Sequence, residues 1–237
     1  MTEQLYRDDA YLNECTATVT GINDRGGILL DRTVFYATSG GQAGDCGLLT
    51  DGENEYPIGV AVYDENKQIV HVPAAAGAAP EPGAELTARL DWPARYNHMR
   101  MHTCLHLLCS LLQYPVTGGS ISGTTGRLDF DVPEAILDKD ELTTALNELI
   151  AADHAVTSDW ITDEELLAQP DLVRTMAVKP PMGSGKVRIV KIGLDGEVDL
   201  QPCGGTHVKS TGEIGSVTVT KIEKKGRQNR RVRVSLD

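Results

Sequence analysis

His102-Thr103-Cys104-Leu105-His106 and Cys203-Gly204-Gly205-Thr206-His207 each place two metal-binding side chains four residues apart. Together the two pairs supply three imidazoles and one thiol, which is the nitrogen and sulfur donor set that zinc prefers. The chain holds only six histidines and five cysteines, and three of the histidines and one of the cysteines form these pairs. We therefore predict that one zinc ion joins the two segments, with His102, His106, Cys203 and His207 as its ligands.

The two segments differ in the local structure that their sequences predict. Residues 96–112 carry apolar side chains at helical spacing and contain no glycine or proline, which indicates a helix. Residues i and i+4 share one helix face, so His102 and His106 point the same way, while Cys104 and Cys109 are predicted core residues. The second segment follows a proline and contains two glycines, which favours a tight loop.

Either pair alone is a weak signal. An isolated His-x-x-x-His on an apolar helix is more often a packing feature than a metal site, and an isolated Cys-x-x-x-His in a glycine-rich loop is no stronger. The co-occurrence of the pairs favours the metal, because a zinc site needs about three or four protein ligands and the two pairs together supply four.

The composition is that of a globular protein from a reducing compartment. The chain has 237 residues, of which 41% are apolar, so it has the size of one large domain or two small ones. It contains no run of about eighteen apolar residues that would span a membrane, and its first residues lack a signal-peptide pattern. Five cysteines without disulfide-like spacing predict free thiols, and we expect a cytoplasmic protein of undetermined oligomeric state.

The charge is distributed unevenly. The formal net charge of −12 by itself argues against nucleic-acid binding. Residues 221–237 differ, because seven Lys or Arg residues against two acidic ones give this segment a charge of +5. Such a stripe could hold a phosphate backbone while the acidic remainder stays soluble. A solvated pair of charged strands accounts for the same composition equally well.

Residues 1–88 are predicted to form a small barrel or sandwich of short strands. Apolar stretches interrupted by Asp, Asn and Gly indicate strands at residues 17–22, 27–30, 33–36, 47–49, 58–63 and 68–72. A strand at residues 85–90 closes this module. The Ala, Pro and Gly of residues 73–83 predict an exposed loop.

Residues 89–237 are predicted to mix helices and strands. Helices are expected at residues 93–113 and 139–151, and Thr162 with Glu165 matches a helix capping box. Strands are expected at residues 120–121, 127–131, 187–192, 197–200, 216–223 and 230–236, the last two joined as a hairpin. The predicted fold class is therefore α+β.

Two glycine-rich segments could be taken for ligand loops. Gly183-Ser184-Gly185-Lys186 lacks the spacing of a phosphate-binding loop and precedes a predicted strand, so a hairpin turn is favoured. Ser39-Gly40-Gly41-Gln42-Ala43-Gly44-Asp45 is typical of a structural turn, although glycines also let a ligand approach the backbone closely.

These residues together resemble one known family. The segment from His102 to Leu108 resembles the His-x-x-x-His helix of the alanyl-tRNA synthetase editing domain, and Gln201 to Val208 is similar to its Cys-x-x-x-His segment. Thr33-Val34-Phe35-Tyr36, followed by residues 39–45, resembles the glycine-rich part of the small barrel that precedes that domain. The chain has no room for an aminoacylation domain, so it resembles a free-standing editing protein of the AlaX type.

The resemblance implies a domain order, an activity and a set of contacts. A small β-barrel domain at residues 1–88 would precede a zinc-binding editing domain at residues 89–237. The implied reaction is hydrolysis of mischarged tRNA(Ala), mainly the seryl and secondly the glycyl ester, with one zinc ion as cofactor. The candidate substrate contacts are Gly40, Gly41, Gln42, Thr103, Ser120 and Thr206, and the candidate tRNA contacts are Lys224, Lys225, Arg227, Arg230 and Arg231.

The mechanism leaves alternatives open. Four protein ligands close a zinc site, whereas catalysis needs an open coordination position, so we expect one ligand, His207, to be exchangeable. The spacing singles out no Asp or Glu as a general base. A module that binds aminoacyl-tRNA around a structural zinc, or a zinc hydrolase of small esters, would use the same ligands.

Overall fold

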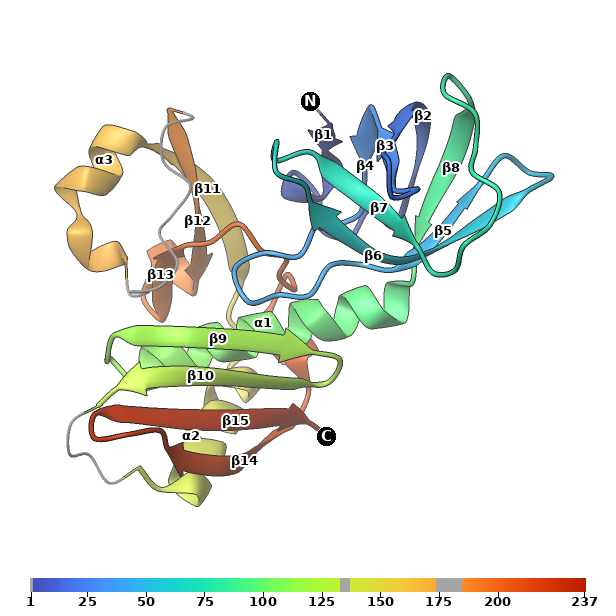
Figure 1. Ribbon diagram of the computed structural model, residues 1–237. Helices are drawn as coiled ribbons and strands as arrows, with labels where there is room; N and C mark the ends of the chain where they lie inside the picture. The colour runs from blue at the N-terminus through green and yellow to red at the C-terminus, as the bar shows by residue number, and fades with distance from the viewer. Residues whose placement is uncertain (1, 133–136, 174–184) are drawn as a thin grey trace. The chain divides into compact units, whose positions relative to one another are not determined.

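The chain separates into two units, Met1–Asn97 and His98–Asp237, in a computed structural model that describes residues 2–132, 137–173 and 185–237 (Figure 1). The division falls inside α1 (Trp92–Leu111), a helix whose first residues belong to the first unit. The predicted domain boundary between residues 88 and 89 stays a prediction. Among the described residues, no helix is both long and apolar enough to cross a membrane.

The first unit is a closed barrel of six strands. Neighbouring strands pair in the order β2-β3-β7-β6-β5-β8, and every pair is antiparallel. The strands are β2 (Glu14–Ile22), β3 (Ile28–Leu30), β5 (Gly47–Thr50), β6 (Glu55–Tyr63), β7 (Ile69–Pro73) and β8 (Glu85–Leu90). Two short strands, β1 (Glu3–Gln4) and β4 (Arg32–Thr33), pair in parallel outside the barrel. Alternate side chains fill the interior, so the predicted small barrel is confirmed.

The predicted strand at residues 33–36 is wrong beyond Thr33. The following residues form a buried loop in which side chains, rather than a neighbouring strand, bond the Val34 carbonyl and the Tyr36 N–H. The Asp45 carboxylate accepts the Tyr36 N–H at 2.5 Å, and the Arg95 guanidinium donates to the Val34 carbonyl at 2.6 Å. Arg95 also forms a fully buried ion pair with Asp45. The short apolar stretch predicted a strand, but these distant partners could not be seen in the local sequence.

A neutral histidine is buried in the barrel and makes the barrel sensitive to acid. His71 Nδ1 lies 3.1 Å from the Ile28 carbonyl oxygen, and its Nε2 lies 2.8 Å from the Thr33 hydroxyl. Burial lowers the pKa of His71 from 6.5 to about 4. Between these values the unfolded chain binds a proton that the folded chain does not. The stability that neutral His71 contributes is therefore complete above pH 6.5 and is lost as the pH falls towards 4.

We expect the free energy of unfolding of the barrel to fall by about 3 kcal/mol between pH 6.5 and pH 4 because of this one side chain. Urea denaturation at half-unit pH steps measures the effect. A His71→Gln variant has no titrating group there, so its stability should change less over the same interval. Parallel pH profiles for the two proteins would contradict the prediction.

Among its described residues, the second unit contains two antiparallel sheets, the larger part of α1 and two further α-helices. A four-stranded sheet has the order β14-β15-β10-β9, and a three-stranded sheet has the order β11-β12-β13 (Figure 1). The strands are β9 (Val116–Ser122), β10 (Thr125–Asp131), β11 (Val156–Thr162), β12 (Lys186–Ile192), β13 (Asp199–Pro202), β14 (Val217–Lys224) and β15 (Asn229–Leu236), and the other helices are α2 (Lys139–Ala151) and α3 (Asp163–Ala168).

Helices cover one face of the four-stranded sheet. A Cβ added at Gly126 on β10 would lie 2.5 Å from the Met101 sulfur, so α1 packs closely on this strand and a larger residue would displace the Met101 side chain. Asn147 on α2 exchanges two hydrogen bonds with the Val217 backbone, at 2.8 and 3.0 Å. The Asn147 side chain therefore provides hydrogen-bond partners for the Val217 N–H and carbonyl group on the edge strand β14.

Most elements of the second unit match the sequence prediction. The helix at 139–151, the Thr162–Glu165 capping box and the β14–β15 hairpin are confirmed. The strand predicted at 197–200 lies two residues later, because residues 194–196 form a 3-10 turn with Asp195 at φ +55°. Strand β11 was missed. The turn predicted at 183–186 begins outside the described residues.

Candidate metal centre

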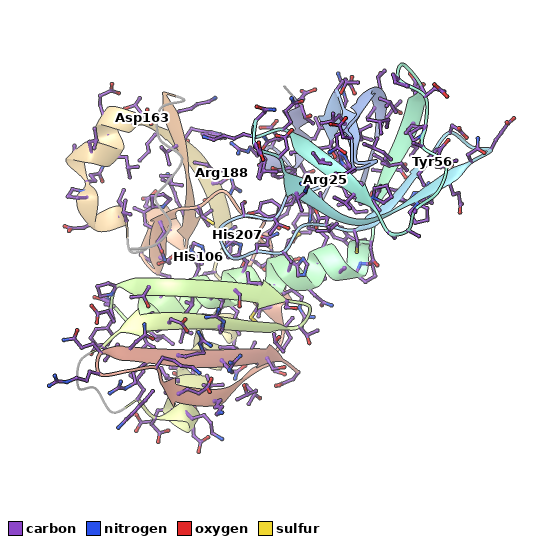
Figure 2. All side chains as sticks on the ribbon, in the orientation of Figure 1. Arg25, Tyr56, His106, Asp163, Arg188 and His207 are labelled. Carbon is purple, nitrogen blue, oxygen red and sulfur yellow. The ribbon has the colours of Figure 1, made fainter. Side chains whose placement is uncertain are left out.

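Four side chains from the two predicted segments meet in the second unit. The possible ligand atoms of His102, His106, Cys203 and His207 all lie within 4.8 Å of one another. Cys203 Sγ lies 3.6 Å from His102 Nε2 and 3.3 Å from His207 Nε2. Figure 2 shows His106 and His207 near α1, and their ring centroids are 4.7 Å apart. Three imidazole nitrogens and one thiol at this spacing could hold one metal ion.

The cluster is built from one helix and one loop. His102 and His106 lie one turn apart on α1, with ring centroids 5.3 Å apart. Cys203 directly follows the last residue of β13. The loop after it reverses direction and brings His207 Nε2 to 3.3 Å from Cys203 Sγ. His106 and His207 are 7% and 6% exposed, whereas His102 and Cys203 are half-buried. Solvent therefore reaches the cluster from the side of His102 and Cys203.

A buried carboxylate orients His106. Asp199 on β13 is 1% exposed, and its Oδ2 lies 2.7 Å from His106 Nδ1. Gln201 Nε2 donates to both carboxylate oxygens at 2.8 and 2.9 Å. A neutral His106 that donates its Nδ1–H to Asp199 leaves the Nε2 lone pair for the metal. A carboxylate behind a metal-binding histidine fixes the tautomer and raises the basicity of the ligand.

A hydroxyl orients His207 in the same way. Thr103 Oγ1 donates to the Met99 carbonyl oxygen at 3.0 Å and lies 3.1 Å from His207 Nδ1. The hydroxyl proton is used by Met99, so the His207 Nδ1–H is the donor and its Nε2 faces the cluster. Thr103 also accepts the Val208 N–H at 3.3 Å. This arrangement orients the His207 ring, and the expectation that His207 is the exchangeable ligand stays a prediction.

Arg188 on β12 fixes the loop that carries Cys203 and His207. Its Nη1 donates to the Cys203 carbonyl oxygen at 3.0 Å and to the Gly205 carbonyl oxygen at 2.9 Å. The Arg188 backbone carbonyl accepts the Cys203 N–H at 3.0 Å. Arg188 thus restrains both ends of the Cys203–Gly205 turn.

The charges of the cluster suit a divalent cation. Burial opposes ionisation of Cys203, but the positive charge of His102 brings the pKa of this thiol well below its usual value. Burial also lowers the pKa of His106, but hydrogen bonds to Asp199 and Cys203 outweigh this effect and raise the pKa to about 10. A thiolate and the Asp199 carboxylate bring two negative charges, which a 2+ ion balances when the three imidazoles are neutral.

We expect an Asp199→Ala substitution to weaken metal binding by about 10- to 100-fold, because His106 loses the group that fixes its tautomer. Asp199→Asn keeps an acceptor but loses the charge, and its effect should be smaller. Competition with a chromophoric chelator measures both. Asp195→Asn, at an exposed position before the same strand, is the matched control. Equal metal affinity in Asp199→Ala and wild type would contradict the positioning role.

The other predicted substrate residues lie in several places. In the first unit, Gly40 and Gly41 have φ angles of +56° and +85° and form an exposed two-residue turn between Ser39 and Gln42. Gln42 is buried in that unit. In the second unit, Thr206 is buried in the metal-binding loop, and the half-buried Ser120 lies on β9.

The predicted tRNA contacts divide into two groups. Lys224, Lys225 and Arg227 are exposed where β14 turns into β15, although Lys225 lies 3.6 Å from Glu223. Arg231 forms two bonds to Asp129, at 2.7 and 2.8 Å. Arg230 is buried and donates to the Asn229 carbonyl oxygen. The last two arginines are therefore engaged by the protein itself.

Comparison with known proteins agrees with this arrangement. Residues 187–233 match the threonyl and alanyl tRNA synthetase second additional domain, and residues 8–94 match the class II (A) tRNA synthetases. The alanyl-tRNA editing protein AlaX-M of Methanosarcina acetivorans is 33% identical, over 100% of this chain and 99% of the relative. AlaX-M of Saccharolobus solfataricus is 32% identical, over 98% of each chain. An alanine–tRNA ligase of Pyrobaculum aerophilum is 32% identical over 94% of this chain and 25% of the ligase.

The metal-binding segments, the barrel and the end-to-end match point to the same conclusion. The chain belongs to the AlaX family of alanyl-tRNA editing proteins.

Proposed function

We propose that this protein hydrolyses the ester bond of mischarged tRNA(Ala), with seryl-tRNA(Ala) as the main substrate and glycyl-tRNA(Ala) as the second. The products are the free amino acid and tRNA, and the proposed compartment is the cytoplasm, where free thiols persist. One observation carries the proposal: four zinc-type ligands converge in a chain that matches alanyl-tRNA editing proteins over its whole length.

The proposed cofactor is one zinc ion held by His102, His106, Cys203 and His207. When bound, zinc polarises a carbonyl or lowers the pKa of a water from about 15.7 towards about 7. In this proposal the substrate approaches from the side of His102 and Cys203, because His106 and His207 are more deeply buried. Asp199 and Thr103 hold the two buried imidazoles in place behind the site.

To spare correctly charged alanyl-tRNA(Ala), the protein needs polar groups that can form a hydrogen bond with a serine side chain but not with an alanine side chain. A pocket that hydrogen-bonds the serine hydroxyl leaves its own buried groups unpaired when alanine is bound. The proposed contacts within the second unit are Ser120 and Thr206. The turn formed by Gly40, Gly41 and Gln42 in the first unit stays a separate prediction. Thr103 acts in this proposal through His207, since its hydroxyl already donates to Met99.

Lys224, Lys225 and Arg227 are proposed to contact tRNA phosphates, with Arg230 and Arg231 shaping the strand that carries them. Phosphate contacts position the tRNA without reading its sequence. Replacing all three exposed residues by Gln should reduce the salt dependence of tRNA binding by about one unit of log–log slope per lost contact. Binding by the wild type that does not change with salt would contradict this assignment.

The test is deacylation by the purified protein of tRNA(Ala) charged in parallel with serine, glycine or alanine. We expect release of serine, slower release of glycine, and little release of alanine. Removal of the metal by a chelator should abolish all release, and zinc should restore it. A free seryl ester tests the narrower alternative of a small-ester hydrolase. Stable seryl-tRNA(Ala) in the presence of zinc-loaded protein would contradict the proposal.

A second candidate is an aminoacyl-tRNA-binding module with a structural zinc. The observation in its favour is that four protein ligands complete a tetrahedral site. Such a module would bind seryl-tRNA(Ala) and protect its ester from spontaneous hydrolysis. The deacylation assay separates the two candidates, because the rate of serine release rises in one case and falls in the other.

A further inference from the structure

One face of the three-stranded sheet runs from the exterior to the metal centre. The register places Val190 opposite Gln201 and Ile192 opposite Asp199. Gln201 donates to the Asp199 carboxylate, which lies 2.7 Å from Nδ1 of the buried His106. Successive side chains on a strand alternate between faces, so Lys186 and Arg188 share the face of Val190.

Trp160 completes this face on the neighbouring strand β11. It lies directly opposite Arg188 in the β11–β12 pairing. The exposure changes along the face. Asp199, Gln201 and Val190 are buried, Arg188 is half-buried, and Lys186 and Trp160 are exposed, the tryptophan by 36%. We call Trp160, Lys186 and Arg188 the rim face, because they lie where the metal-supporting face reaches solvent.

The chemistry of the rim face is an aromatic ring with two cations. Lys186 Nζ lies 4.8 Å from the centroid of the Trp160 ring. Arg188 uses Nη1 to hold the carbonyl oxygens of Cys203 and Gly205, so its charge lies beside the metal-binding loop. An exposed tryptophan next to cations is the combination that binds single-stranded nucleic acid, through base stacking and phosphate contacts. The chain as a whole has a net charge of −12, so a local pair of cations is a place where an RNA phosphate can be attracted.

We propose that the rim face binds the single-stranded 3′ end of the charged tRNA. A base stacks on Trp160, and the adjoining phosphates contact Lys186 and Arg188. This inference rests on the proposed function, because it takes the aminoacyl end to lie at the metal centre. Lys186 and Val190 are four residues apart, which corresponds to about 13 Å along the strand at about 3.3 Å per residue. The terminal ribose can therefore reach the centre while an upstream base meets Trp160.

Lys186 moves from the ring to a phosphate when the base arrives. A lysine ammonium on a flexible four-carbon stem can make this exchange at small cost, whereas the planar fork of Arg188 stays fixed on the loop. The occupant is RNA rather than a protein segment because Trp160 is the one large apolar side chain among the three residues of the rim face, and the other two are cations.

The first test measures RNA binding without hydrolysis. The chain has two tryptophans, so a Trp92→Phe background leaves Trp160 as the only indole reporter. Uncharged tRNA(Ala), or a short single-stranded RNA with the same 3′ terminus, should quench its fluorescence on binding to the zinc-loaded protein. Saturating RNA that leaves the Trp160 emission unchanged would overturn the proposal.

The second test compares variants on the two faces of the same strand. In filter binding, Trp160→Ala should weaken binding by between about five- and 150-fold, and Trp160→Phe by less, because a phenyl ring still stacks. Lys186→Gln should weaken binding and reduce the salt slope by about one. Lys191→Gln removes the same charge from the opposite face of β12 and should bind as the wild type does. Equal losses from the two lysine variants, or wild-type binding by Trp160→Ala, would overturn the proposal.

Kinetics separates this inference from the proposed function. For seryl-tRNA(Ala), most of the loss in Trp160→Ala should fall on KM rather than on kcat, with the metal content equal to that of the wild type. A loss that falls on kcat alone would overturn the role of the rim face in binding. A wild-type protein that binds RNA at Trp160 and leaves the ester intact would contradict the proposed hydrolysis and leave the RNA-binding assignment standing.

Discussion

A Cys203→Ser protein is expected to lose its metal and its deacylase activity together. Cys203 is the single thiol of the cluster, and the positive charge of His102 favours its thiolate form. A serine hydroxyl in its place stays protonated near neutral pH and is a poor zinc ligand. Structural zinc sites bind with roughly 10–16 kcal/mol at pH 7, so losing one of four ligands should weaken binding by about 100-fold or more.

The measurement is metal content after dialysis against a weak chelator, followed by a seryl-tRNA(Ala) deacylation assay. Cys15→Ser is a matched control, because Cys15 is a half-buried free cysteine of the barrel unit. It should retain full metal and full activity. A Cys203→Ser protein with one tightly bound zinc per chain would contradict the assignment of Cys203 as a ligand.

Replacing Arg95 by Met is expected to destabilise the barrel unit by about 3–5 kcal/mol. Arg95 and Asp45 are both essentially inaccessible to solvent, and removing one charge leaves the other buried without its partner. The substitution also removes the donors to the carbonyl oxygens of Val34 and Ala10. Burying a polar backbone group without a partner adds to the cost.

Chemical denaturation followed by the fluorescence of Trp92, in a Trp160→Phe background, measures the loss. The double variant Arg95→Met/Asp45→Asn removes both charges, and we expect it to be less destabilised than the sum of the single variants. Arg89→Met is the matched control, because the Arg89–Glu14 ion pair is exposed and contributes little. A loss below about 1 kcal/mol for Arg95→Met would contradict the role of the buried pair.

The metal-binding segments could be predicted because their geometry is local. Two histidines four residues apart must share a helix face, and glycines after Pro202 favour a loop. The positioning residues were not predicted, although part of the signal was present. Asp199 and Gln201 alternate on the strand that ends just before Cys203, so they share one face. Arg188 could not be found in this way, because its place beside the loop depends on the pairing of β12 with β13.

The errors in the fold prediction have similar causes. Residues 34–36 form a short apolar stretch typical of a strand, but the side chains of Asp45 and Arg95, distant in sequence, take the place of a neighbouring strand. Strand β11 was missed because Thr157, Ser158, Asp159 and Trp160 are all exposed, so the period-two pattern that marks a half-buried strand is absent. Local sequence propensity shows neither the contacts of Asp45 and Arg95 with residues 34–36 nor the pairing of β11 with β12.

X-ray absorption at the zinc K-edge of the purified protein tests the central claim most directly. The account predicts one zinc per chain with a single sulfur neighbour at about 2.3 Å and nitrogen neighbours at about 2.0–2.1 Å. The sulfur neighbour should disappear in Cys203→Ser and persist in Cys15→Ser. A zinc ion surrounded only by oxygen and nitrogen in the wild type, or a protein purified and supplied with zinc that retains none, would contradict the account.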